Sequence, residues 1–250
     1  MRARQPDRPP HPRVNMAAEY RIDAEIFRLY PGYRRGLVLG QQLRNGASSA
    51  SLSEQLRAQE AALRERVQGN PAEHPRIAAW REAYRRFGAR PSDFRSSIEA
   101  LARRVLRGDA LPGINALVDI GNLVSLRYLV PVGVHPVPEG EGMLCLRLSE
   151  PTDSFLPPDG AAAEVPEKGE VVFVQASTVL TRRWTWRQSA LTLTQPATTA
   201  VFFNIDALPG VPDEEVEAAM RDIGLLVREH CGGEVQSTVL RDSASSWQYC

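Results

Sequence analysis

Residues 51–108 show apolar side chains every three or four positions, the spacing of helices with one buried face. Three such stripes follow one another: Leu52, Leu56, Leu63 and Val67; then Ile77, Trp80, Tyr84 and Phe87; then Phe94, Ile98, Leu101 and Val105. Start and stop residues delimit them, namely the Ser51/Glu54 capping box, Pro75 and Pro91-Ser92 at the beginnings, and Gly69, Gly88 and Gly108 at the ends. The pattern predicts three helices whose arginine-rich sides face outward.

Short runs rich in β-branched and aromatic residues predict strands on both sides of this helical region. Two runs, 26–30 and 36–40, flank Pro31-Gly32 and indicate an antiparallel pair. Later runs predict strands at 143–148, 171–174, 179–181, 200–204 and 235–240. The 171–174 and 179–181 strands are joined by a connection of hairpin length. A further helix is expected from Pro212, with acidic residues in its first turn and a stripe of Val216, Met220, Ile223 and Val227.

The chain of 250 residues, 43% of them apolar, is long enough for a substantial core. Residues 1–16 are rich in Pro and Arg and are expected to be a disordered segment, with Met16 as an alternative start. We expect one folded domain at 17–240 and a flexible tail at 241–250. Neither an export signal nor a membrane-spanning run is recognisable, so a cytoplasmic protein is expected.

Charge is unevenly distributed although the formal net charge is zero. Residues 1–107 carry 21 Arg against 11 acidic residues, whereas residues 108–250 carry eight Arg and one Lys against 19 acidic residues. A basic half can meet a phosphate backbone, although coding bias toward arginine and arginines on solvated helix faces are the more ordinary explanation. Cys145, Cys231 and Cys250 have no paired spacing and the four histidines no metal spacing, so neither a metal nor another cofactor is expected.

Residues 114–128 combine two stripes on one predicted helix. Asn115, Asp119 and Asn122 share a face at positions i, i+4 and i+7, next to an apolar face. Short amide and carboxylate side chains compete with the helical backbone, so solvated faces usually carry longer polar residues. These three side chains are therefore expected to bond something, either the main chain of a neighbouring loop or a bound polar ligand.

Residues 181–188, Thr-Arg-Arg-Trp-Thr-Trp-Arg-Gln, hold two of the four tryptophans. In an extended strand, Trp184 and Trp186 point the same way and form an aromatic surface beside guanidinium groups. Such a surface suits a base or an amino acid, and the arginines suit phosphate. The alternative is a tryptophan pair packed on a helix, with arginines extending past it. His135 lies at a predicted helix-to-strand junction, where loops often place functional groups, although surface histidines are common there too.

The segment Leu111-Pro-Gly-Ile-Asn-Ala-Leu-Val-Asp-Ile-Gly-Asn-Leu-Val-Ser resembles the tRNA-binding and editing module of the bacterial phenylalanyl-tRNA synthetase β subunit, the B-three/B-four domain. The resemblance is strongest to free-standing proteins made of that domain. It includes Val124-Ser-Leu126, the run from Pro131 to His135, and Arg182-Arg-Trp-Thr-Trp-Arg187, where Thr185 replaces the usual Asn. In the synthetase alignment, the editing histidine falls at Gly133 and a late-strand glutamate at or near Asn204.

The resemblance implies an α+β fold in which a mixed or antiparallel sheet and packed helices enclose a pocket. In the synthetase this pocket hydrolyses tyrosine attached to the phenylalanine tRNA, a second sieve for close analogues. By analogy, this chain is expected to be cytoplasmic, to bind tRNA or aminoacyl-tRNA, and to deacylate a mischarged tRNA in trans. It is not expected to aminoacylate tRNA by itself.

The implied site assigns roles to named residues. His135 and Asn204 are the predicted catalytic residues. Substrate binding is assigned to Asn115, Asp119, Asn122, Trp184 and Trp186, and phosphate or RNA binding to Arg182, Arg183 and Arg187. Two alternatives stay open: a non-catalytic module that binds free amino acid or RNA, and a protein whose aromatic strand binds a partner protein. Neither DNA nor a membrane is an expected partner.

Overall fold

The computed structural model describes residues 18–138 and 142–249, and the strands in these ranges form two sheets. The six-stranded sheet has the order β10-β1-β4-β5-β6-β7 and consists of β1 (Ala18–Ile22), β4 (Leu144–Leu148), β5 (Val171–Gln175), β6 (Thr178–Arg182), β7 (Arg187–Gln188) and β10 (Ser246–Tyr249). The four-stranded sheet has the order β3-β8-β2-β9 and consists of β2 (Arg34–Gln41), β3 (Val132–Pro136), β8 (Val201–Ala207) and β9 (Glu234–Leu240). Neighbouring strands are antiparallel except β1 and β4, which are parallel.

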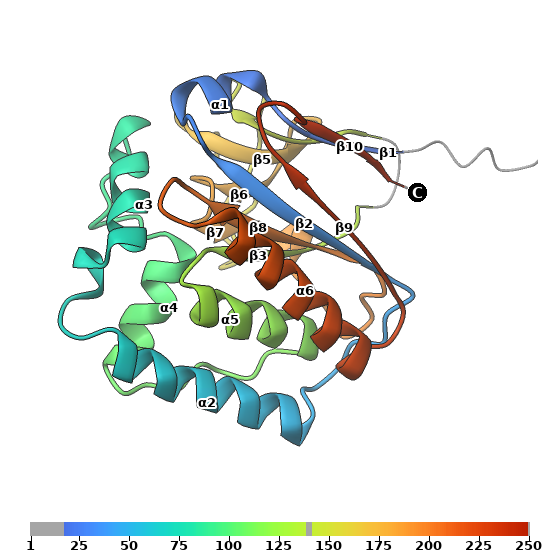
Figure 1. Cartoon of the computed structure of the whole chain (residues 1–250). Coiled ribbons are helices and arrows are strands. Elements are labelled where there is room, and N and C mark those ends of the chain that lie inside the picture. The colour runs from blue at the N-terminus through green and yellow to red at the C-terminus, as the bar shows by residue number, and fades with distance from the viewer. Residues whose placement is uncertain (1–17, 139–141, 250) are drawn as a thin grey trace, which may run out of the picture.

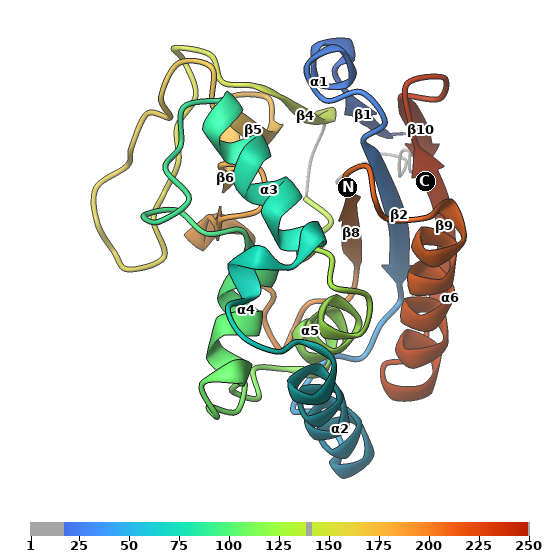
Figure 2. The ribbon, with the colours of Figure 1, turned by 60° about the vertical axis from the view of Figure 1, so that its left-hand side comes forward.

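The helices pack around these sheets, as Figures 1 and 2 show. They are α1 (Ala24–Leu29), α2 (Ala50–Arg66), α3 (Pro75–Arg86), α4 (Ser97–Leu106), α5 (Ala116–Tyr128) and α6 (Asp213–His230), with short 3₁₀ turns η1 (Pro71–Glu73) and η2 (Ala190–Thr192). Helix α6 runs along β2 and β9, and α5 lies between α6, α2 and α4 (Figure 2). The α+β fold expected from the sequence is confirmed.

Aromatic side chains join the two sheets face to face. The Tyr20 ring of β1 stacks on Phe173 of β5 with centroids 5.2 Å apart, and meets Phe202 of β8 edge-on at 5.2 Å. All three are buried. Since burying one large apolar side chain contributes about 1.5–3 kcal/mol, these contacts hold the six-stranded sheet against the four-stranded one. A cavity forms where the two sheets and α5 come together.

Close packing of α5 on β3 places the helix beside the sheet. A Cβ on Gly121 would lie 2.6 Å from Val134 Cγ2, so only glycine permits this approach. The chain then turns sharply from α5 into β3, through Leu129 at a φ of 51°. The Ser125 hydroxyl donates a hydrogen bond to the Val130 carbonyl oxygen at 2.6 Å and closes this turn. Asn122, next to Gly121, is thereby fixed close to β3.

Several sequence predictions need correction. Residues 26–30 were expected as a strand, but 26–29 belong to α1 and Tyr30 is its C-cap, because the Asp23 carboxylate accepts a hydrogen bond from the Glu25 amide and caps a helix there. The third predicted helix begins at Ser97 instead of Pro91, since Ser96 provides its cap. The first begins at Ala50, capped by Ser49.

The ends of the chain also differ from expectation where they are described. Residues 246–249, assigned to a flexible tail, form β10 and pair with β1, which the sequence pattern did not predict either. Edge pairing and contact of Trp247 and Tyr249 with Phe202 explain this order. The predicted disordered segment 1–16 lies outside the described residues. None of the helices within the described ranges combines the length and the apolar character needed to cross a membrane.

Candidate functional site

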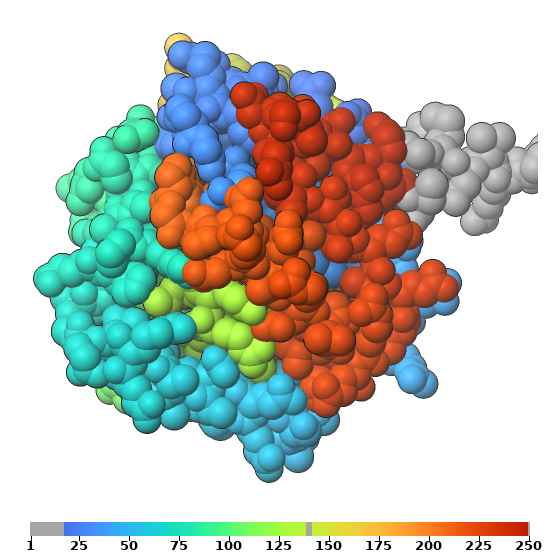
Figure 3. All heavy atoms as spheres, viewed as in Figure 1, coloured from blue at the N-terminus to red at the C-terminus, as the bar shows by residue number. Residues whose placement is uncertain are grey.

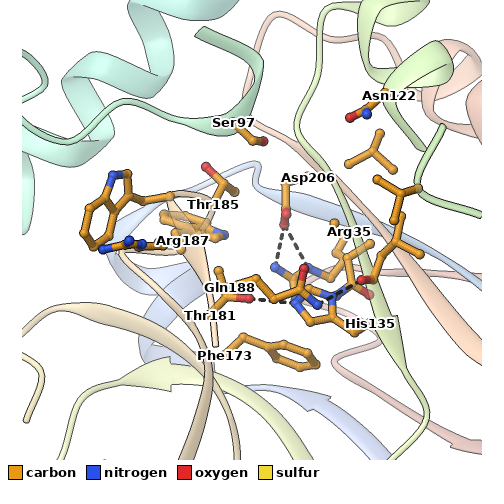
Figure 4. Close-up of a pocket in the computed structure, with 17 residues that line it drawn as sticks. Arg35, Ser97, Asn122, His135, Phe173, Thr181, Thr185, Arg187, Gln188 and Asp206 are labelled. Atoms are coloured by element: carbon orange, nitrogen blue, oxygen red, sulfur yellow. Dashed lines mark hydrogen bonds and ion pairs between the residues drawn. The ribbon is translucent and has the colours of Figure 1, made fainter. Parts of the chain in front are cut away.

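A cavity of about 190 Å³ opens between α5, β3, β8 and the segment 181–188 (Figure 4). Of the residues predicted for the site, the cavity is lined by Asn122, His135, Trp184, Trp186, Arg187 and Asn204. Further lining comes from Arg35, Ser97, Phe173, Thr181, Thr185, Gln188 and Asp206, with valines of α5 and β3. Side chains far apart in the sequence therefore meet in one cavity, which has both polar and apolar lining residues.

The segment 181–188 is not the continuous strand that the sequence suggested. Strand β6 ends at Arg182, residues 183–186 form a tight turn, and β7 follows. Arg183 and Trp184 have φ values of 46° and 63°, in the left-handed region that residues other than glycine adopt at a cost of about 1 kcal/mol or more each. The two tryptophans consequently point to different surroundings instead of forming one surface.

Glu170, which precedes β5, holds this turn. Its carboxylate accepts hydrogen bonds from Arg182 Nε at 3.0 Å, from Arg182 Nη2 at 2.7 Å and from the Arg183 amide at 2.9 Å. The side chain is almost wholly buried. A bidentate guanidinium–carboxylate pair of this kind fixes both partners, so Glu170 offsets the unfavourable backbone of the turn. The sequence analysis missed it, and a lone glutamate at a strand start gave no signal.

Arg182 and Arg183 do not face the cavity. Arg182 is also paired with Glu164, while Arg183 lies 3.2 Å from Glu167 and stacks over Phe94 with its guanidinium carbon 3.6 Å from the ring centroid. Both are buried. The acidic loop 151–170 neutralises them, which corrects the expectation that they are open to phosphate. Arg187 differs, because it is a third exposed, lines the cavity and pairs with the exposed Asp159 at 2.9 Å.

Asn115 and Asp119 are also outside the cavity, and both bind main chain. Asn115 is the N-cap of α5: its Oδ1 accepts from the Val118 amide at 3.1 Å and its Nδ2 donates to the Thr194 carbonyl at 3.1 Å. Asp119 accepts hydrogen bonds from Ser48 Oγ at 2.6 Å and from the Ile114 amide at 3.2 Å. The alternative of bonding a neighbouring loop therefore describes these two, and Asn122 alone of the stripe reaches the cavity.

Trp184 is a core residue that also borders the cavity. Its ring meets Tyr30, Tyr33 and Trp80 edge-on with centroids 4.7, 4.8 and 5.1 Å apart, and it is 2% exposed. Trp186 is only half-buried and packs edge-on against Phe94 at 4.9 Å. Of the two indoles, Trp186 is the one accessible for contact with a ligand.

His135 lies in β3 with both ring nitrogens engaged. Nε2 is 2.7 Å from Thr181 Oγ1 (Figure 4). Nδ1 is 3.2 Å from Asn204 Nδ2. Burial, and secondarily the nearby Arg35 guanidinium, lowers the pKa of His135 from 6.5 to about 3. The imidazole is therefore neutral at pH 7, and the Asn204 amide donates to its bare Nδ1.

Asn204 leaves one polar atom unsatisfied. Its Oδ1 is buried and has no hydrogen-bond partner among the described residues. A buried unsatisfied acceptor costs about 1–3 kcal/mol. Because Asn204 lines the cavity, a ligand or a water molecule with a free N–H or O–H group would relieve that cost.

Arg35 and Asp206 add a buried ion pair that the sequence analysis missed. Tyr33 donates to the carboxylate, and Arg35 Nη1 donates to the Tyr20 hydroxyl at 2.8 Å. Asp206 follows Asn204 by two positions on β8, so both project from the same face. That alternation of polar residues within an apolar strand was the available signal. Arg35 carries no uncompensated charge into the cavity.

No group of three His, Cys, Asp or Glu side chains within 18–138 and 142–249 is arranged to hold a metal ion. Cys145 and Cys231 are buried and unpaired, and neither lines the cavity. Burial raises the pKa of Cys231 to about 11, which keeps this thiol protonated and unreactive. Hydrogen-bonding side chains are thus the chemistry that the cavity offers.

The fold and cavity define an α+β domain with a polar pocket between two sheets and a helix. The B3/4 domain family matches residues 79–232, more than half of the chain, and this chain belongs to that family. Comparison with curated proteins gave no match. Among solved structures, an N-terminal fragment of the phenylalanyl-tRNA synthetase β-subunit from Pyrococcus horikoshii is similar over 91% of this chain, with 14% identity and a TM-score of 0.44. The chain spans about half of that structure, 55% of its length.

Proposed function

We propose that this protein binds the aminoacylated 3′ end of a tRNA and hydrolyses the ester of a mischarged amino acid. The observation that carries the proposal is the convergence of Asn122, His135 and Asn204 on one cavity, with a buried acceptor on Asn204 that lacks a partner. Membership of the B3/4 domain family and the resemblance to the synthetase editing module support the choice of substrate.

The dimensions of the cavity favour an amino-acid moiety. Its volume of about 190 Å³ is below the roughly 300 Å³ at which sites for drug-sized ligands begin. In this proposal the amino acid enters, while the terminal adenosine stays at the mouth, where Trp186 provides a stacking surface and Arg187 a guanidinium. Stacking of one base on an aromatic ring contributes about 1–3 kcal/mol.

The proposed chemistry is ester hydrolysis without a covalent intermediate. A water oxygen attacks the ester carbonyl carbon, the bond from that carbon to the ribose oxygen breaks, and the ribose oxygen takes the proton that the attacking water loses. The products are a free amino acid and a tRNA with an intact terminal ribose. Orientation of substrate and water, together with donors directed at the developing oxyanion, would supply the rate. Neutral His135 positions groups and does not act as the proton acceptor, because an imidazole with a pKa of about 3 is a weak base.

The direct test is deacylation of a panel of mischarged tRNAs, each labelled on the amino acid. We expect release of at least one amino acid well above the uncatalysed rate, with correctly charged phenylalanine tRNA as the reference substrate. Asn122→Ala should reduce that rate, whereas Arg90→Ala, a change at an exposed side chain that does not line the cavity, should not. Turnover of no ester in the panel would exclude the enzymatic function.

A second candidate is a non-catalytic module that binds free amino acid or RNA. Both nitrogens of His135 are bonded within the protein, and the carboxylate lining the cavity, Asp206, is paired with Arg35. Among the described residues that line the cavity, no free proton acceptor of ordinary basicity is left. A rise in melting temperature with an amino acid, without cleavage of any ester, would favour this candidate. We do not retain the hypothesis that the aromatic strand binds a partner protein, because Trp184 lies in the core.

A further inference from the structure

Gly133 and His135 are two positions apart on β3, so they lie on the same face of the strand. In the antiparallel ladder Gly133 is paired directly with Asn204 of β8. Side chains of directly paired residues are neighbours, about 4.5–5.5 Å apart at Cβ. Asn204 is paired directly with Leu37 of β2 on its other side, so one of the two positions opposite Asn204 carries no side chain.

The imidazole of His135 fills the space above Gly133. A Cβ built on Gly133 would lie 2.8 Å from His135 Cε1 and 3.3 Å from its Nδ1, and 3.9 Å from the Cβ of Asn204. A carbon–carbon separation of 2.8 Å is well inside the optimal contact distance of about 3.5–4.0 Å. Gly133 has no positive φ, so this position requires glycine for space and not for backbone conformation.

Three contacts hold the His135 ring in this position. Phe173 meets it edge-on with centroids 5.2 Å apart, Thr181 binds Nε2 from β6, and Asn204 binds Nδ1 from β8. The ring thus bridges the two sheets across the vacancy at Gly133. A methyl group at residue 133 would push it away from Asn204, and the Asn204 amide would lose the acceptor that orients it.

We propose that Gly133 is a positioning residue of the site. Because Gly133 has no side chain, the His135 imidazole can lie against Asn204. This contact orients the Asn204 amide so that its Oδ1 can accept a hydrogen bond from a ligand. The ligand part of this inference rests on the proposed function. The geometric part stands independently, because it concerns contacts between Gly133, His135 and Asn204 alone.

A double-mutant cycle tests the geometry without any ligand. The four proteins are the wild type, Gly133→Ala, His135→Ala and the double variant, compared by melting temperature. We expect Gly133→Ala to lower the melting temperature by about 5 °C in the wild type. In the His135→Ala background, where the ring is gone, the same change should shift it by less than about 1 °C. Equal shifts in both backgrounds would overturn the proposal.

Gly46→Ala is the matched control, since a Cβ there meets no atom within 4 Å and the φ is not positive. It should leave the melting temperature and the turnover of mischarged tRNA unchanged. Gly133→Ala should reduce that turnover at least tenfold, and the double variant should not restore it, because the imidazole is missing. Full activity of Gly133→Ala would refute the positioning role. If the wild type hydrolyses no ester, the proposed function fails, while the thermal cycle still decides the geometry.

Discussion

Arg35 and Asp206 form a buried ion pair beside the cavity, with Arg35 Nη2 2.7 Å from Asp206 Oδ1 and the two side chains 1% and 4% exposed (Figure 4). The pair links β2 to the neighbouring β8 and is completed by hydrogen bonds with Tyr20 and Tyr33. A charge in such surroundings is tolerated only while its partner and hydrogen bonds are present. The wall of the cavity formed by β2 and β8 therefore depends on both residues.

Replacing one partner of the Arg35–Asp206 ion pair should lower the free energy of unfolding more than replacing both. We expect Arg35→Met to lower the free energy of unfolding by about 3–5 kcal/mol, because Asp206 is left as an unpaired buried carboxylate. The double variant Arg35→Met/Asp206→Leu should recover most of that loss. Urea unfolding measures both. Arg90, which is 82% exposed and pairs with Asp93, provides the control. If Arg35→Met lowered the free energy of unfolding as little as Arg90→Met does, this account would be contradicted.

Glu170 should matter far more than the neighbouring acid of the same loop. Glu170→Gln removes the charge that binds Arg182 and the Arg183 amide, and we expect a loss of about 3 kcal/mol of unfolding free energy. Glu167→Gln, whose side chain is 76% exposed, should cost less than about 0.5 kcal/mol. Thermal unfolding followed by tryptophan fluorescence reads out the turn that carries Trp184 and Trp186, and comparable losses in the two variants would contradict the assignment.

Asn115 and Asn122 should separate stability from ligand binding. Asn115→Ala removes the cap of α5 and should cost about 1 kcal/mol or more, with ligand affinity unchanged. Asn122→Ala should leave stability within about 0.5 kcal/mol and weaken binding of the aminoacyl ligand. Calorimetric unfolding and a binding titration on the same two proteins make the comparison. If Asn115→Ala instead weakened ligand binding and left stability unchanged, Asn115 would be a ligand-binding residue.

Stability should fall in acid partly through His135. Its pKa is about 3 in the folded protein and 6.5 as an ordinary histidine, so between these values the unfolded chain binds a proton that the folded protein does not. Stability is therefore complete above pH 6.5 and declines as the pH falls toward 3, by up to about 1.4 kcal/mol per pH unit. In His135→Gln that contribution disappears, whereas carboxylates and His74 titrate alike in both proteins. Parallel pH profiles of unfolding free energy would refute the buried neutral imidazole.

Arg187 should be the arginine of its segment that contacts a phosphate. If tRNA binds as proposed, Arg187→Gln should weaken binding and reduce the slope of log affinity against log salt by about 0.7–0.9. Asp159→Asn should strengthen binding, because it frees Arg187 from its exposed pair. Arg90→Gln serves as the exposed control. Salt titrations of tRNA affinity decide this, and unchanged slopes for Arg187→Gln would place the phosphate elsewhere.

The packed surface that joins the helices to the sheets could be anticipated residue by residue. The stripes of α2, α3 and α6 are buried largely as their spacing indicated, and Figure 3 shows parts of all three helices on one face of the molecule. Periodicity suffices here because burial of one side of a helix depends on local spacing alone. The strand edges were harder: β1 and β10 have weak patterns of their own and are ordered by pairing with each other.

The Arg/Trp segment shows where local pattern fails. Alternation along 181–188 suggested one aromatic face. Instead, Arg183 and Trp184 have left-handed backbone that the contact with Glu170 stabilises, and the two indoles point to different surroundings. The Glu170 carboxylate also binds the Arg182 guanidinium. No rule of spacing within the segment reveals a carboxylate eleven residues or more upstream, since the turn is unfavourable by itself and exists only through that contact.

The sequence by itself determined the positions of most helices and strands and the residue types from which a polar site could be built, while the α+β class was implied by the family resemblance. These positions follow from periodicity and backbone preference, which act over a few neighbouring residues. The tertiary structure decided which of those side chains share the cavity. It directed Asn122, His135, Asn204 and Trp186 into the cavity and used Asn115, Asp119, Arg182 and Arg183 as internal ties. Each of these four ties includes a partner from another segment of the chain, which local spacing cannot reveal.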